Sequence, residues 1–263
     1  MFTYAYENLA NIIQIMVYLM VLIKAAKLFI DSEGSIIVVF FSFAVFSLLI
    51  TDIYWVAYDI LRPDARMPFA ANEFGEAAGF LLLASVITAV FGDRLIHETK
   101  IMLLCLLFIA GSTALWIGWS GEWIQDIITG FAFGYLLCVS VMSLRAIDAF
   151  SKGGWYAVGL FSMILILCQA AIFFVPDNLK KPLDLLCYAL MFTILAVLIL
   201  RCIIAIRSDY SSERIISLAF FCSVWSVSTM YMSAGTWYVA AQFAETLIAP
   251  LMLFGVRKEV LSE

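Results

Sequence analysis

Acidic and aromatic side chains follow helical spacing in the most polar stretch of the chain. Asp52, Trp55 and Asp59 occur at positions i, i+3 and i+7, so they would share one face of an α-helix. Glu73 and Glu76 stand three residues apart near the start of the next apolar segment, where a helix dipole favours carboxylates. Carboxylates and aromatic rings in this arrangement predict an outward-facing site for a cation, an amine or a peptide segment.

Part of this stretch also has a structural interpretation. The alternative is an outer cap held by ion pairs among Asp59, Arg62, Asp64 and Arg66. Asp52 and Glu76 differ from these residues because they lie inside apolar segments. Ionisable groups within a membrane span are costly and usually face a cavity or a partner, so the functional interpretation is stronger for these two residues.

A second polar group lies in the last apolar segment. Tyr238, Gln242 and Glu245 share a helical face at i, i+4 and i+7. Pro250 lacks a backbone N–H, which leaves a carbonyl near residue 246 without its helical donor. A carboxylate, an amide and a free carbonyl predict an ion or proton site. The alternative is a glutamate that joins neighbouring helices by hydrogen bonds.

One further carboxylate is a candidate for the same outer acidic group. Asp126 follows Glu122 and Gln125 at the start of a predicted helix. Acidic residues are common at that position because they complement the helix dipole. Asp126 lies one turn into the helix, so we also consider it a candidate ligand.

The sequence lacks the residues that several kinds of chemistry require. His97 is the only histidine, which excludes paired haem ligands and a His-rich metal site. The six cysteines form no CxxC pair, and no lysine lies in the middle of an apolar segment. We therefore expect no cofactor, no metal and no catalytic residues. An enzyme is the less favoured class, although a mechanism that uses carboxylates alone stays open.

The amino-acid composition indicates whether these side chains are positioned in a soluble protein or in a membrane protein. The chain has 263 residues, of which 65% are hydrophobic and 13% are charged. Soluble domains contain about half apolar and about a quarter charged residues, so the chain is expected to be an integral membrane protein. The formal net charge of −5 argues against nucleic acid as a partner.

The expected fold is all-α, a polytopic membrane bundle of about nine helices in a single domain that covers residues 1–263. A span requires about 20 apolar residues, and nine segments meet this length. The segments are residues 9–30, 35–61, 74–92, 99–119, 123–145, 154–175, 182–206, 214–234 and 237–256. Gly235 marks the turn between the last two. Eight spans, with one segment re-entrant, is the main alternative.

Basic residues predict the orientation. Most of them fall on one side of a nine-helix bundle, and cytoplasmic loops are enriched in Lys and Arg. That side carries Lys24, Lys27, Arg94, Lys100, Arg145, Lys152, Arg201, Arg207, Arg214, Arg257 and Lys258. The N-terminus is therefore predicted outside and the C-terminus in the cytoplasm, most consistent with a bacterial cytoplasmic (inner) membrane.

A weak internal repeat relates residues 9–94 to residues 182–257. The triplet Phe74-Gly75-Glu76 resembles Phe243-Ala244-Glu245. Parallel repeats of this kind occur in transporters. The pattern predicts that the first three helices correspond to the last three.

Two function classes follow from these patterns. The first is a small transporter or channel for a cation, a proton or a cationic solute. The second is a non-catalytic sensor, or an integral subunit of a larger complex. The expected partners are the lipid bilayer and a small cation, with a second membrane protein or a second copy of the chain as a further possibility.

Overall fold

The computed structural model describes residues 2–61, 71–95, 99–120, 123–172 and 174–262. Within these ranges, the side chains of residues 2–5, 59, 71–72, 112, 115–116, 118–120 and 123–126 lie outside the description. The described residues form α-helices and one short 3₁₀ helix, Gly92–Arg94, and contain no strand. The all-α prediction is therefore confirmed for the described chain.

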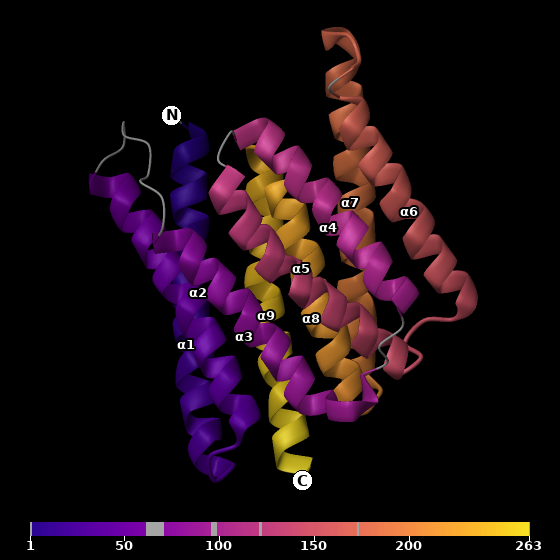
Figure 1. Cartoon of the computed structure of the whole chain (residues 1–263). Coiled ribbons are helices and arrows are strands. Elements are labelled where there is room, and N and C mark those ends of the chain that lie inside the picture. The colour runs from indigo at the N-terminus through magenta and orange to yellow at the C-terminus, as the bar shows by residue number, and fades with distance from the viewer. Residues whose placement is uncertain (1, 62–70, 96–98, 121–122, 173, 263) are drawn as a thin grey trace.

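Nine α-helices follow one another along the chain (Figure 1). They are α1 Phe2–Asp31, α2 Ile36–Leu61, α3 Ala71–Phe91, α4 Thr99–Ser120, α5 Trp123–Ala146, α6 Lys152–Ala171, α7 Asp177–Arg207, α8 Ser212–Tyr231 and α9 Thr236–Ser262. Each overlaps one of the nine predicted segments. Gly235, with φ +59°, supplies the left-handed backbone in the turn between α8 and α9.

Eight of these helices are long and apolar enough to cross a membrane. In α4 the apolar portion with described side chains, Thr99–Gly111, is shorter than a span. Since a helix rises about 1.5 Å per residue, this portion alone covers little more than half of the hydrocarbon layer. The described residues therefore support a membrane bundle with eight spans, and the ninth span remains a prediction.

One boundary differs from the sequence-based expectation. The segment beginning at residue 182 is α7, which starts earlier, at Asp177, with Pro176 as its N-cap. Pro182 therefore lies inside the helix and not in the preceding connection. Pro176 suits the N-cap because the first N–H groups of a helix have no intrahelical acceptor. Pro182 is the sixth residue of α7, so its missing N–H leaves the Asn178 carbonyl without a helical donor.

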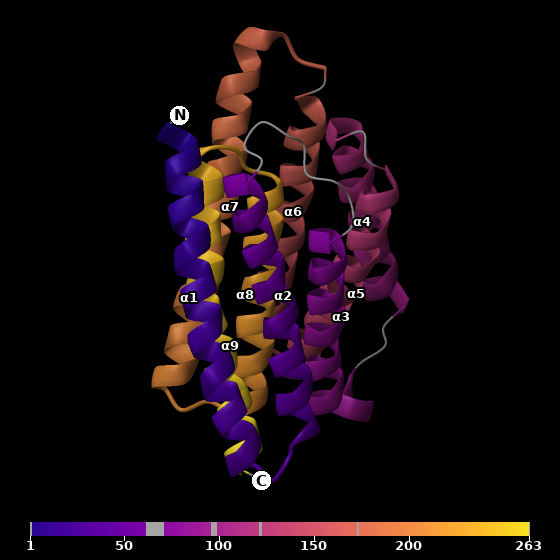
Figure 2. The same cartoon turned by 90° about the vertical axis from the view of Figure 1, so that its left-hand side faces the viewer.

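The helices alternate in direction, so the two termini lie at opposite ends of the bundle (Figure 1). The first three helices pack side by side, with α2 between α1 and α3. Turning the molecule by 90° shows α9 beside α1, and α8 between this group and the remaining helices (Figure 2). The end that contains the N-terminus also carries the start of α3 and the α8–α9 turn.

Helix α8 is the centre of the bundle. It contacts α3, α5, α7 and α9, and its residues from Ile215 to Thr229 are all buried. Two side chains attach it to neighbouring backbones: the Trp225 indole N–H donates to the Met191 carbonyl at 3.1 Å, and the Ser226 hydroxyl donates to the Ala241 carbonyl at 3.0 Å. Helix–helix contact, and not lipid, therefore surrounds α8.

Glycines allow two helix pairs to approach closely. A Cβ at Gly75 would lie 2.2 Å from the Thr51 Oγ1, and one at Gly79 would lie 2.8 Å from a Leu48 methyl. In α5, Gly134 meets Ile109 of α4 in the same way. Gly75 and Gly79, and Gly130 and Gly134, have the GxxxG spacing that is typical of closely packed membrane helices.

Ion pairs occur at the end that contains the C-terminus. Arg94 pairs with Glu213 at 2.6 Å, and Lys258 pairs with Asp209 while donating to the Tyr210 carbonyl at 2.8 Å. The Lys258 ammonium lowers the pKa of the Asp209 carboxyl below its usual range. These exposed pairs contribute little to stability individually.

The orientation of the bundle remains a prediction with a direct test. We expect a cysteine at Glu33, in the α1–α2 turn, to react with a membrane-impermeant maleimide only from the cytoplasmic side. A cysteine at Thr236, which begins α9 at the other end, should react only from outside. The six native cysteines are buried or half-buried, and the unmodified protein measures their background. The opposite labelling pattern would show that the bundle has the opposite orientation in the membrane.

Candidate functional site

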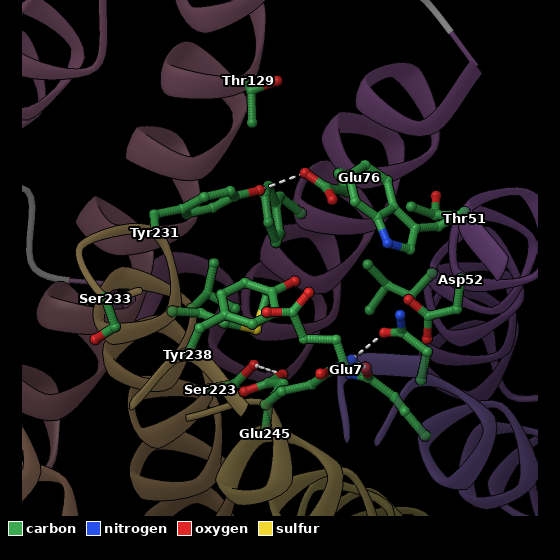
Figure 3. Close-up of a pocket in the computed structure, with 18 of the residues that line it drawn as sticks. Glu7, Thr51, Asp52, Glu76, Thr129, Ser223, Tyr231, Ser233, Tyr238 and Glu245 are labelled. Carbon is green, nitrogen blue, oxygen red and sulfur yellow. Dashed lines mark hydrogen bonds between the residues drawn. The ribbon is translucent and has the colours of Figure 1, made fainter. Parts of the chain in front are cut away.

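A cavity of about 650 Å³ lies in the half of the bundle that contains the N-terminus (Figure 3). Side chains from α1, α2, α3, α5, α8 and α9 line it, together with the turn between α8 and α9. On α3 the lining runs from Glu73 to Leu83, and on the last helix from Gly235 to Glu245. Ten helical residues rise about 15 Å, so the cavity reaches roughly halfway through a bilayer core.

Five carboxyl groups from four helices line this cavity. They are Glu7 of α1, Asp52 of α2, Glu73 and Glu76 of α3, and Glu245 of α9. No Lys, Arg or His lies among the described residues of its wall. A cavity whose ionisable groups are all acidic, and whose walls are otherwise apolar, concentrates a negative electrostatic potential.

The structure brings together most of the residues that the sequence singled out. Those that line the cavity are Asp52, Trp55, Glu73, Glu76, Gln242 and Glu245. The side chains of Asp59 and Asp126 lie outside the described part of the chain. The proposed outer cap of Arg62, Asp64 and Arg66 also lies outside it. The residues on α2, α3 and α9 thus meet across one cavity, although they are far apart in sequence.

Glu76 is held by a tyrosine from the central helix. The Tyr231 hydroxyl donates a hydrogen bond to the Glu76 Oε2, which joins α8 to α3 (Figure 3). Thr51, whose Oγ1 donates to the Ser47 carbonyl at 3.0 Å, lies close to Gly75, the neighbour of this glutamate. The close approach of α2 and α3 therefore positions Glu76 and Asp52 on the same wall.

Glu245 is anchored at the deep end of the cavity. The Ser223 hydroxyl donates to the Glu245 Oε1 at 2.6 Å, while the Oε2 is buried without a hydrogen-bond partner. Only 3% of the glutamate surface is exposed. Thr246 does not line the cavity, so the carbonyl that Pro250 was expected to free is not part of this arrangement.

Gln242 connects the last helix to the first. Its amide nitrogen donates to the Asn11 Oδ1 and, at 2.8 Å, to the Gln14 Oε1. Gln14 in turn donates to the Tyr18 hydroxyl at 3.0 Å. These three residues of α1 are buried, so a chain of amides and a phenol forms one wall of the cavity.

Three oxygens in the wall of the cavity are hydrogen-bond acceptors without a donor. Asp52 Oδ2, Gln242 Oε1 and Glu245 Oε2 are buried with no partner, and all three are acceptors. The Thr129 hydroxyl is also buried without a partner. A buried acceptor without a donor costs free energy, and a ligand that carries N–H groups or positive charge would satisfy these oxygens.

Aromatic side chains complete the walls. They are Tyr18, Trp55, Phe80, Tyr231 and Tyr238. Aromatic faces attract cations and pack well against methylene groups. The combination of carboxylates and rings therefore suits an organic cation.

A compact metal site is not found among the described side chains, where no three His, Cys, Asp or Glu residues could hold one ion. The carboxyl groups are instead distributed over the cavity. Metal ligands must lie within about 2.0–2.6 Å of the ion, so carboxyl groups that are distributed over the cavity favour a larger ligand.

Sequence reasoning missed the contribution of α1 and α8. Asn11, Gln14 and Tyr18 follow the spacing i, i+3 and i+7, a polar stripe in an otherwise apolar helix. This spacing was a usable signal for α1. Tyr231 carried no such signal, because its importance depends on Glu76, which comes from a helix distant in sequence.

Comparison with known protein families, with curated proteins and with solved structures finds no match to this chain. Its function must therefore be inferred from the chemistry of the cavity.

Proposed function

We propose that this protein binds a cationic solute in the acidic cavity and carries it across the membrane. The observation that supports the proposal best is the meeting of three buried carboxyl groups from three helices, those of Asp52, Glu76 and Glu245, in one cavity. A membrane interior tolerates such groups mainly where they face a substrate or ion pathway.

The cavity has the size and position expected of a transport site. Pockets for small ligands measure about 300–1,000 Å³, and transporters place their sites near the bilayer midplane. The deep end contains Glu245 and the apolar side chains of Leu48, Leu83 and Val227. Passage toward the other end would require these helices to separate there.

The alternative is a sensor or a subunit of a larger complex. Its best support is α6, whose only buried residues are Leu165 and Gln169, while its other residues are half-buried or exposed. Lipid tails would cover this apolar surface as well as a partner helix would. The cavity favours solute binding and transport, and we rank this function first.

Charge movement in proteoliposomes tests the proposal. Cations are applied to wild-type protein and to Glu245→Gln, and the evoked current is recorded on a solid-supported membrane. The panel includes Na⁺, K⁺, Mg²⁺, butylammonium and 1,4-diaminobutane. We expect at least one cation to evoke a current that is reduced about tenfold in Glu245→Gln, because loss of a charge contact of about 1.4 kcal/mol changes affinity tenfold.

Glu33→Gln provides the matched control for that experiment. Glu33 is exposed in the α1–α2 turn, at the opposite end from the cavity, so its current should equal that of wild type. Equal currents in wild type and Glu245→Gln would remove Glu245 from the mechanism. No current from any cation would contradict the transport proposal.

A further inference from the structure

We propose that the solute is a linear aliphatic diamine or polyamine, whose ammonium groups occupy two separate carboxylate positions in the cavity. This inference rests on the proposed function and specifies its substrate class. It follows from the spacing of the anchored carboxylates, the unpartnered acceptors and the aromatic walls.

The residues that anchor the two carboxylates lie about two turns apart on one helix. Tyr231 holds Glu76 and Ser223 holds Glu245, and these two residues are separated by eight positions on α8. Eight helical residues correspond to an axial rise of about 12 Å. A single ammonium group or metal ion, which contacts its ligands within about 3 Å, can therefore reach only one of the two positions.

A chain with an ammonium at each end can reach both. The axial rise between the two anchoring residues is about 12 Å. Two N⁺–H···O⁻ contacts of roughly 2.8 Å each occupy part of this length, so the two nitrogens of the ligand would lie on the order of 6 Å apart. A short alkane chain spans this separation. Asp52 lies within electrostatic reach of both Glu76 and Glu245, so a third carboxyl group is close to both positions.

The unpartnered oxygens require hydrogen-bond donors. Gln242 Oε1 and Glu245 Oε2 belong to side chains that are 2% and 3% exposed, and both line the cavity without a partner. A primary ammonium carries three N–H donors. A quaternary ammonium carries none, so it would leave these acceptors unsatisfied.

The walls between the two positions suit methylene groups. Tyr18, Trp55 and Tyr238 line the same cavity as the two carboxylates. Aromatic rings bury apolar chain while their faces attract the adjoining ammonium groups. A compact inorganic cation would gain nothing from this surface.

A series of matched ligands tests the inference on purified full-length protein by isothermal titration calorimetry. The probes are 1,4-diaminobutane, butylammonium, the permethylated bis-quaternary analogue of the diamine, and Mg²⁺. We expect the diamine to bind at least tenfold more tightly than any of the other three. Glu76→Gln should weaken diamine binding about tenfold and leave butylammonium binding unchanged.

The variants are chosen so that the fold is retained. Glutamine at position 76 keeps an oxygen that accepts the Tyr231 hydrogen bond, and Glu33→Gln again serves as the exposed control. Equal affinity for the diamine and butylammonium, or tighter binding of Mg²⁺ or the quaternary analogue, would overturn the diamine inference while leaving cation binding intact. Failure of every cation to bind would overturn both the inference and the proposed function.

Discussion

Gly75→Leu is expected to lower the free energy of unfolding of the bundle by about 3 kcal/mol, at the upper end of the range for overpacked positions. The first atom of the new side chain would already lie 2.2 Å from the Thr51 Oγ1 and 3.3 Å from the Ser47 carbonyl oxygen. Rotating the threonine away would break its 3.0 Å hydrogen bond to Ser47. Helices α2 and α3 would have to separate, and thermal unfolding in detergent measures the loss.

Two further variants identify the cause of that loss. Gly159→Leu places the same side chain on α6, where nothing lies within 4 Å of the new Cβ, so its unfolding midpoint should stay close to that of wild type. Gly75→Ala should be less destabilising when combined with Thr51→Ala, because the clashing hydroxyl is then absent. Equal midpoints for Gly75→Leu and Gly159→Leu would contradict the close approach of α2 and α3.

Gln242→Leu is the second variant for which we expect a large effect. It removes the amide that donates to two buried acceptors of α1, the Asn11 Oδ1 and the Gln14 Oε1. Each unsatisfied acceptor costs about 1–3 kcal/mol, so the free energy of unfolding should fall by about 2–6 kcal/mol. Hydrogen exchange measured by mass spectrometry should increase in α1, because this helix loses its link to α9.

The same substitution at another buried glutamine is the control. Gln169 of α6 is also 2% exposed, but its Oε1 has no hydrogen-bond partner. Leucine there removes an unsatisfied group and should change stability little. If Gln169→Leu destabilises the protein as much as Gln242→Leu does, the amide chain between α1 and α9 does not hold these helices together.

The helices themselves were predictable, because a hydrophobic segment must be about 20 residues long to span a bilayer. Helical periodicity also placed Asp52 with Trp55, and Gln242 with Glu245, on shared faces. Periodicity describes one helix at a time, so it could not show that these faces meet across one cavity. The start of α7 was placed at residue 182, whereas the helix begins at Asp177 and contains Pro182.

The internal repeat remains a prediction. It pairs Glu76 with Glu245, and both residues line the cavity. Their shared location is what the repeat expects, but inward-facing carboxylates in any bundle would meet in the same way. The amides of α1 and the tyrosine of α8 have no counterpart in the repeat, and tertiary packing alone makes them neighbours of the carboxylates.

The burial of α8 has a consequence for how the protein is made. Among the eight candidate spans, α8 has the lowest mean hydropathy and the largest buried share. Its buried Ser223, Ser226 and Thr229 are poorly suited to contact with lipid. We infer that α8 is stable in the bilayer only after α7 or α9 packs against it, so its insertion depends on a neighbouring helix.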